Sequence, residues 1–172
     1  MQDPVDADTR DLRVWLVRVS HGGAKELRNR VIEAGSMAKV EVLVMRADMV
    51  FGSDHIRSAL YHAKRAIREG RNASESLAME TLLYASGERQ LSTAIRKMSV
   101  EDGADEVVVA QLTPGPIEEG RSWKPMERMN EGSRAESLAR FGVSKEELAT
   151  VGSAKALDLV LERVASVDVL KK

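Results

Sequence analysis

The sequence predicts an α+β fold, in which a helical block combines with a small β-sheet in a single compact domain. Three segments rich in β-branched and apolar residues predict strands, at Arg13–Val19, Lys39–Met45 and Glu106–Leu112. Between the second and third lies a long stretch whose apolar residues recur at helical spacing. Strands on both sides of a helical block argue against a doubly wound parallel sheet. The length of 172 residues suits one domain with its own core.

Apolar residues spaced three and four apart predict the helices. Gly35 and Ser36 are expected to end the first helix, and Asp54 is expected to cap the second. Asn72 with Glu75 resembles a capping box for the third helix, which is apolar nearly all round and should be the central buried one. The expected helices are Ala24–Ala34, Asp54–Gly70, Ser74–Ser86, Glu88–Met98 and Ser153–Ala165.

The remaining segments complete the predicted organisation. Met1–Asp11 contains four aspartates and is interpreted as a mobile acidic tail, with the domain running from 12 to 172. Lys39–Met45 is apolar on both faces, which predicts a central strand. Pro114–Ser133 is rich in Pro, Gly and Glu and predicts a surface loop. Val167–Leu170 is expected to form a short edge strand or an extended tail.

Composition narrows the class of protein. The chain has no cysteine, which excludes disulfides, thiolate metal ligands and a cysteine nucleophile. No apolar run reaches the roughly 20 residues of a membrane helix, and we expect a cytoplasmic protein without membrane contact. Charge is uneven, because residues 12–100 carry 15 Lys/Arg against 9 Asp/Glu and residues 101–172 carry 10 against 14. A basic half can face nucleic acid and an acidic half protein, although ordinary surface charge gives the same counts.

Known catalytic motifs are absent from the sequence. There is no GxxxxGK phosphate loop, GxGxxG, HExxH or GxSxG. His21-Gly22-Gly23 without a nucleophile elbow predicts only a turn. His55 and His62 stand seven apart on one predicted helix, whereas helical metal ligands usually stand three or four apart. We therefore expect no enzyme activity, no cofactor and no metal site.

Glu80 is a charged residue inside the most apolar predicted helix, where a buried apolar side chain is expected. Burial of a carboxylate costs several kcal/mol unless it is paired or multiply hydrogen-bonded. We expect a buried structural charge, with Arg89 or a turn of backbone amides as donor. The alternative is a small enzyme that uses Glu80 and His55 as an acid–base pair.

The helix predicted at Asp54–Gly70 carries a basic stripe. Arg57, Tyr61, Lys64, Arg68 and Arg71 recur at spacings of four and three, so they share one face. Cations with an interleaved aromatic ring can follow a phosphate backbone and stack on a base. A solvated helix face is the other interpretation. An unrelated DNA-binding domain also stays open, although no recognition-helix motif is evident.

Three segments resemble the small subunit of the KEOPS complex, the subunit that binds the kinase-like ATPase PRPK. The first segment contains Ala47-Asp48, Gly52, His55, Ala59 and Ala63. The second contains a Ser-Gly-x-Arg-Gln stretch and its flanks, and the third lies near the C-terminus. The second segment reads Met79-Glu80-Thr81-Leu82-Leu83, Ala85-Ser86-Gly87-Glu88-Arg89-Gln90-Leu91 and Ala94-Ile95. The third reads Leu161-Glu162-Arg163-Val164-Ala165.

This resemblance implies a non-catalytic subunit of the complex that forms threonylcarbamoyladenosine in tRNA. Members of the family bind and stimulate the kinase-like ATPase, and they bind tRNA, including its 3′ CCA end. The implied docking surface is the helix Glu88–Met98 with Leu91, Ile95 and Met98, and Met98 is expected at its rim. The implied tRNA-binding residues are Arg18, Arg57, Tyr61, Lys64, Arg68 and Arg89.

Overall fold

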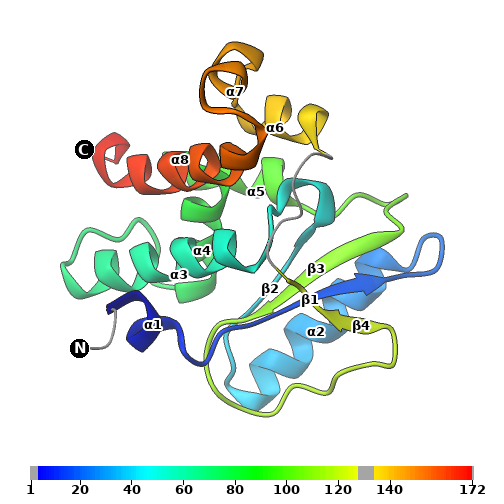
Figure 1. Ribbon diagram of the computed structural model, residues 1–172. Helices are drawn as coiled ribbons and strands as arrows, with labels where there is room; N and C mark the ends of the chain where they lie inside the picture. Colours follow the sequence, from blue (N-terminus) through cyan, green and yellow to red (C-terminus); the bar gives the residue numbers. More distant parts are fainter. Residues whose placement is uncertain (1–3, 128–133, 172) are drawn as a thin grey trace.

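A computed structural model describes residues 4–127 and 134–171. The elements form three layers (Figure 1), with helix α2 (Ala24–Ala38) on one face of a four-stranded sheet and a helical block on the other. The helices of the block include α3 (Ser53–Arg68), α4 (Leu77–Ser86), α5 (Leu91–Met98) and α8 (Ala156–Leu170). The predicted α+β class is confirmed.

All strand pairs of the sheet are antiparallel. The strands are β1 (Arg13–Arg18), β2 (Val42–Arg46), β3 (Glu106–Gln111) and β4 (Trp123–Pro125), in the order β2-β3-β1-β4. The expectation of a central second strand is wrong, because β2 lies at an edge. Its side chains are apolar on both faces because a helical layer covers each face of the sheet, and this burial does not require a strand on each side.

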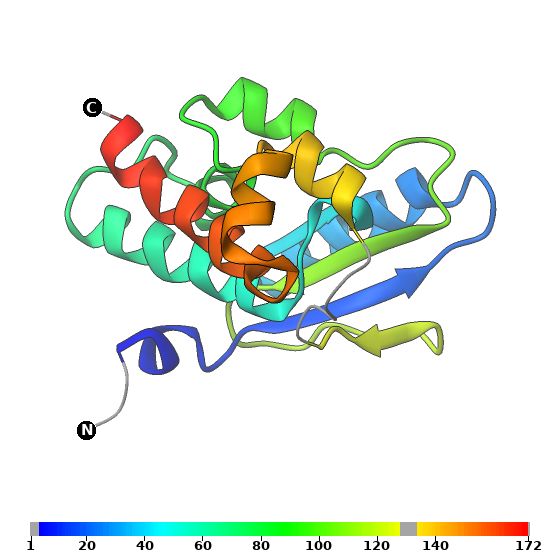
Figure 2. The same cartoon turned by 45° about the horizontal axis from the view of Figure 1, so that its top comes forward.

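The alternation of side chains along the strands builds two separate cores. On β3, Val107 and Val109 pack in the cluster that contains Leu27 and Val31 of α2. Val108 and Ala110 point the other way, into the larger cluster formed with the helical block. The period of two thus divides one short strand between two layers. Figure 2 shows the sheet between α2 and the block.

Helix α4 is the central helix, as its composition predicts. Residues 80–86 of this helix are all buried, and it packs against α3, α5 and α8. Gly87 ends it in the left-handed conformation, with φ +69°. Helix α5 begins at Leu91, three residues later than expected, because Gln90 has extended geometry.

Helix α2 continues beyond the expected stop at Gly35 and Ser36 and ends at Ala38. Gly35 is buried against the sheet, where an added Cβ would lie 2.8 Å from both the Val40 carbonyl oxygen and a Val42 methyl group. The glycine therefore serves close packing of helix on strand and does not terminate the helix. Lys39, with φ +55°, provides the left-handed cap instead.

Two expected helix caps are also wrong. The residue that precedes α3 is Gly52, with φ +92°, and Asp54 lies in the first turn. The cap of α4 is Ser76, whose hydroxyl accepts from the Met79 amide. Asn72 lies upstream of this cap and donates to the Ser74 carbonyl. Several nearby Ser, Asn and Asp residues suit a cap chemically, and backbone geometry selects between them.

The C-terminal third contains structure that was not predicted. Helices α6 (Ala135–Phe141) and α7 (Lys145–Val151) and the 3-10 turn η2 (Ser153–Lys155) precede α8. Ser144 and Glu147 form a capping box at α7, a signal that was readable in the sequence. Val167–Leu170 belongs to α8, so the expected strand or extended tail is wrong. The expected loop 114–133 contains β4, and its residues 128–133 lie outside the described residues.

The N-terminal segment was expected to be a tail, but residues 4–9 form helix α1 (Pro4–Thr9). This helix packs beside α3 (Figure 1). A short 3-10 turn, η1 (Ala47–Met49), leads from β2 toward α3. The proposed start of the domain at residue 12 stays a prediction.

Candidate functional site

Four of the five residues of the predicted basic stripe lie on α3, whereas Arg71 lies beyond its end and pairs with Glu69 and Asp168. Helix α1 lies across the stripe. Ile56, Ala59, Leu60 and Ala63 of α3 are buried, so the cations occupy the opposite face. Arg57 donates to the Thr9 hydroxyl at 2.9 Å, and Lys64 donates to the Asp8 carbonyl oxygen at 2.7 Å. Arg68 pairs with the Asp8 carboxylate at 2.8 Å. We call Arg57, Lys64 and Arg68 the α3 stripe.

The other predicted tRNA-binding residues lie in different surroundings. Tyr61 is half-buried on α3, edge-on to His62 with ring centroids 5.5 Å apart. Arg18 ends β1 and pairs with Glu106 of β3 at 3.2 Å. Arg89 is exposed in the turn between α4 and α5. The structure therefore does not place all six residues on one continuous element.

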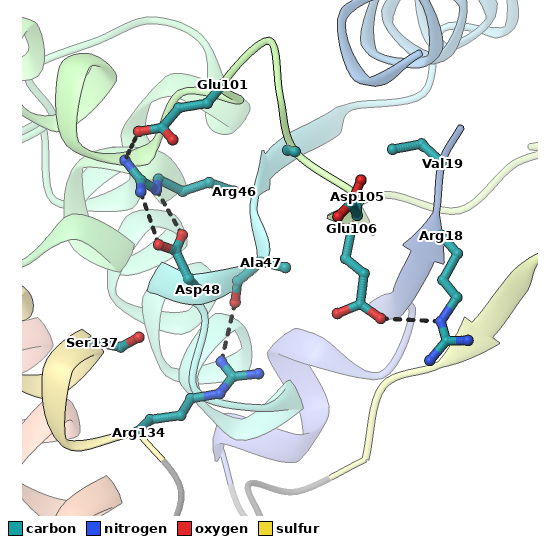
Figure 3. Close-up of a pocket in the computed structure, with 11 residues that line it drawn as sticks. Arg18, Val19, Arg46, Ala47, Asp48, Glu101, Asp105, Glu106, Arg134 and Ser137 are labelled. Atoms are coloured by element: carbon teal, nitrogen blue, oxygen red, sulfur yellow. Dashed lines mark hydrogen bonds and ion pairs between the residues drawn. The ribbon is translucent and has the colours of Figure 1, made fainter. Parts of the chain in front are cut away.

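An open cavity of about 730 Å³ lies where the ends of β1, β2 and β3 approach α6. Figure 3 shows Arg46 between Asp48 and Glu101, with Nε and Nη2 donating to Asp48 at 2.6 and 2.8 Å and Nη1 on Glu101 at 2.7 Å. Arg134 donates to the Ala47 carbonyl oxygen at 3.1 Å. Two carboxylates therefore balance the charge of Arg46, whereas Arg134 donates to backbone carbonyl oxygens.

The same contacts shift the acid–base properties of the Arg46–Asp48 pair. The hydrogen bond with Asp48 raises the pKa of Arg46, and the hydrogen bond from Arg46 lowers the pKa of Asp48. Both groups therefore stay ionised, and neither is suited to exchange protons with a substrate near neutral pH. Sequence patterns did not indicate this cluster, since Glu101 and Arg134 lie far along the chain from Arg46 and Asp48.

A narrow apolar groove follows the outer edge of β2. A cavity of about 120 Å³ is lined there by Ile32 of α2, Met79 of α4 and Ile95 of α5, above Val42 and Val44. Ile32 is 39% exposed and Ile95 is 42% exposed. A second cavity of about 470 Å³ shares Ile32, Met79 and Val42 with the first. The two cavities thus join in one surface depression, which we call the β2 groove. It is apolar around Ile32, Met79 and Ile95, and the second cavity is also lined by the polar residues Ser36, Lys39, Glu41 and Ser76.

The edge of β2 in this groove has unpaired backbone groups. Glu41 accepts from the Leu112 amide, so the alternation of an antiparallel pair turns the backbone N–H and C=O groups of Val42 and Val44 outward. Within the described residues, these groups have no backbone partner outside the ladder. The residues of this edge are themselves little exposed, Val42 at 9% and Val44 at 8%, and the exposed apolar side chains beside them are the groups that a partner can contact.

The predicted docking residues of α5 divide between this surface and the core. Ile95 lies at the groove and Leu91 is half-buried. Met98 is fully buried in the larger core, which corrects its expected place at an accessible rim. It follows Leu91, Ala94 and Ile95 at helical spacing, and the chain beyond it returns to the second core at Val100, so the end of α5 is enclosed.

Glu80 is fully buried, and its donors are a turn of backbone amides and one lysine. The amides of Ala73 and Ser74 donate to Oε2 at 2.9 and 3.0 Å, and Lys171 contacts Oε1. The first expected donor, Arg89, is exposed and does not provide the charge. The contact with Lys171 was not predicted because Lys171 lies far from Glu80 along the sequence.

His55 and Glu80 do not form an acid–base pair. The Phe51 amide donates to Nδ1 of His55 at 3.1 Å, and Nε2 donates to the Ala85 carbonyl oxygen at 2.8 Å. Burial lowers the pKa of His55 to about 4, so the ring is neutral near pH 7. Both ring nitrogens and both Glu80 oxygens therefore have structural partners, and neither residue lines the cavities described above.

A partly buried cluster surrounds Asp168 of α8. His62 and Tyr84 contact its carboxylate at 2.8 and 2.5 Å, and Arg65 and Arg71 also pair with it. Burial acts to raise the pKa of Asp168, but the hydrogen bonds from Tyr84 and His62 outweigh it and lower the pKa. His62 of α3 and Tyr84 of α4 thus hold α8 against these two helices. Asp168 was missed because a strand or tail was expected there.

Within residues 4–127 and 134–171, three or more His, Asp or Glu residues nowhere gather closely enough to hold a metal ion. Nor does any helix in these ranges combine the length and hydropathy needed to cross a bilayer.

The geometry is that of a binding domain. A groove and a charged helix face lie on the surface, and the ionisable side chains of Glu80 and His55 in the core have structural partners. The sequence profile of the family described as kinase binding protein CGI-121 matches residues 20–140. The chain belongs to this family, which is the family of the small KEOPS subunit. No protein of the curated collection matches the chain.

Proposed function

We propose that this protein is a non-catalytic subunit of the KEOPS complex, which forms threonylcarbamoyladenosine in tRNA. In this role it binds and stimulates the kinase-like ATPase subunit in the cytoplasm and recruits tRNA through the 3′ CCA end. Membership of a kinase-binding family supports the first part. The observation that carries the proposal is the β2 groove, where Ile32 and Ile95 are exposed beside an open strand edge.

The β2 groove is the proposed docking surface for the ATPase subunit. Its apolar side chains lie within a continuous depression, and apolar groups in the centre of an interface account for most of its binding energy. Leu91 is half-buried, precedes Ile95 by one helical turn and lines neither cavity; it is kept as a further proposed contact on α5. Met98 has no exposed surface but borders the first cavity of the groove, so we propose that it supports this surface from beneath.

Binding to the purified ATPase subunit tests this surface. Ile95→Glu and Ile32→Glu should each weaken binding by about 30-fold or more, the effect of losing a central apolar contact. Ile67→Glu is the matched control, because Ile67 is 37% exposed on α3 and does not line the groove. Calorimetric titration and the ATPase rate would both be measured. Equal affinity for all three variants would exclude the groove as the docking site.

The α3 stripe, with Tyr61 as a stacking platform, is the proposed tRNA surface. Glu80 is held by Lys171, so Arg89 is exposed and able to meet phosphate as a separate contact. Arg18 is kept as a further proposed contact, although it pairs with Glu106. Cations in a row track a phosphate backbone, and each one lost lowers the salt dependence of binding.

Binding of intact and CCA-trimmed tRNA at several salt concentrations tests this part. Reversal of all three stripe charges to Glu should lower the slope of log K against log salt by about 2, at about 0.7 per single-strand contact. Tyr61→Ala should cost about 1–3 kcal/mol if a base stacks on the ring. Trimming the CCA end should weaken binding far more than a change in the anticodon loop. Equal binding of both tRNAs would contradict recognition of the 3′ end.

A further inference from the structure

The three cations of the α3 stripe all contact the same six-residue helix. Arg57 contacts Thr9, whereas Lys64 and Arg68 contact Asp8, through its carbonyl and its carboxylate respectively. Helix α1 lies along the face of α3 that points away from the core (Figure 1). The most regular basic feature of the sequence is therefore in contact with a segment of the same chain that contains two aspartates, Asp6 and Asp8.

The groups that α1 presents to the stripe are those that RNA would present. Carboxylate, carbonyl and hydroxyl oxygens accept hydrogen bonds from guanidinium and ammonium groups, as phosphate and ribose oxygens do. Lys64 has one compact ammonium group, which donates to the Asp8 carbonyl in this arrangement. A phosphate backbone that followed the stripe would meet α1 in the same place. Occupation by α1 and by RNA is mutually exclusive at these side chains.

We propose that α1 is an intramolecular acidic cover of the α3 stripe, which RNA displaces when it binds. This inference rests on the tRNA surface proposed above and adds a regulatory element to it. Removal of the cover tightens RNA binding, and any event that adds negative charge to α1 or holds it in place weakens RNA binding.

Several features make α1 displaceable. It is six residues long, well below the length at which an isolated helix is stable. Thr9 is its one buried residue. In the ion pair between Arg68 and Asp8, the Arg68 side chain is 53% exposed and the Asp8 side chain is 30% exposed. Exposed ion pairs contribute little to stability. Residues 10–12 connect α1 to β1, so the helix can leave the stripe without disturbing the sheet.

Two matched variants separate contact from charge. Asp8→Ala removes the carboxylate that pairs with Arg68, whereas Asp6→Ala removes an equal charge from an exposed position of the same helix. Binding of a tRNA transcript should be about two- to fivefold tighter for Asp8→Ala than for Asp6→Ala, the range expected for loss of one exposed ion pair. Equal affinities of the two variants would overturn the cover.

Displacement itself can be followed with a nitroxide on α1. The chain has no cysteine and Ala7 is exposed, so Ala7→Cys accepts a single label in the otherwise unchanged protein. The label should be restrained in the free protein and become mobile at saturating tRNA. A label that stays restrained while tRNA binds would show that α1 is a permanent part of the fold.

The outcomes distinguish this inference from the function on which it rests. If tRNA binds and the triple charge reversal weakens it, but the label stays restrained, the RNA surface stands and the cover is wrong. If neither the wild type nor Asp8→Ala binds tRNA, both proposals are wrong. Mobility of the label together with tighter binding of Asp8→Ala supports both.

Discussion

Lys171 places its ammonium group on the buried carboxylate of Glu80, 91 residues away in the sequence. The same ammonium lies 4.4 Å from the centre of the Tyr84 ring. The contact joins the end of α8 to the central helix α4, and the Ala73 and Ser74 amides complete the donor set. The only full charge in the most apolar helix is thus balanced from the C-terminus.

Removal of Lys171 should therefore destabilise the whole domain. Lys171→Ala leaves a buried carboxylate with two backbone amides, and Glu80→Ala leaves a nearly buried ammonium, so each should cost roughly 2–4 kcal/mol of unfolding free energy. Arg89→Ala is the control, since Arg89 is exposed, and its effect should stay within about 0.5 kcal/mol. Urea denaturation measures all three. A loss for Arg89→Ala equal to that for Lys171→Ala would contradict the assigned pair.

His55 should make stability depend on pH. Because burial lowers its pKa from 6.5 to about 4, the unfolded chain binds a proton between these values that the folded chain does not. Stability is therefore full above pH 6.5 and falls on acidification toward pH 4, by roughly 3 kcal/mol in total. His55→Gln should flatten this slope in urea denaturation between pH 7 and 4.5. The exposed His21→Gln is the control, and an unchanged slope for His55→Gln would refute the assignment.

Met98 and Ile95 should respond differently to truncation, although they lie on one short helix. Met98→Ala opens a cavity in the core and should cost about 2–5 kcal/mol. Ile95→Ala removes a side chain that is 42% exposed and should cost about 1 kcal/mol or less. Thermal unfolding of both variants measures the two losses of stability. Similar losses would mean that Ile95 belongs to the core and is not available to a partner.

Gly35→Ala should destabilise the protein, although alanine is the better helix former by about 1 kcal/mol. The new methyl group would meet the Val40 carbonyl oxygen at 2.8 Å, and a backbone atom cannot move aside cheaply. Helix α2 would shift from the sheet, at a cost of about 1–3 kcal/mol typical of overpacking. Unfolding in urea measures whether the free energy of unfolding falls or rises in this variant. A stabilised variant would show that this helix was free to move.

Much of the fold in the N-terminal two thirds of the chain could be predicted, because the sequence patterns that indicate its helices are local. Helical spacing located α3, α4 and α5, and the apolar composition of α4 placed it at the centre. Gly87 marked the end of α4 because a left-handed residue favours glycine. Helices α6 and α7 were missed because each is seven residues long, too short for a clear periodic pattern.

The sequence by itself determined the class of fold, the burial of Glu80 and the basic face of α3. The last two depend on residues within one segment, and the class of fold depends on the order of segments whose spacing and composition are local properties. Only the tertiary structure decided that β2 is an edge, that Lys171 balances Glu80 and that α1 covers the α3 stripe. These relationships join segments that are far apart along the chain. Partners of this kind are selected by packing and charge after the elements assemble, and no local pattern encodes them.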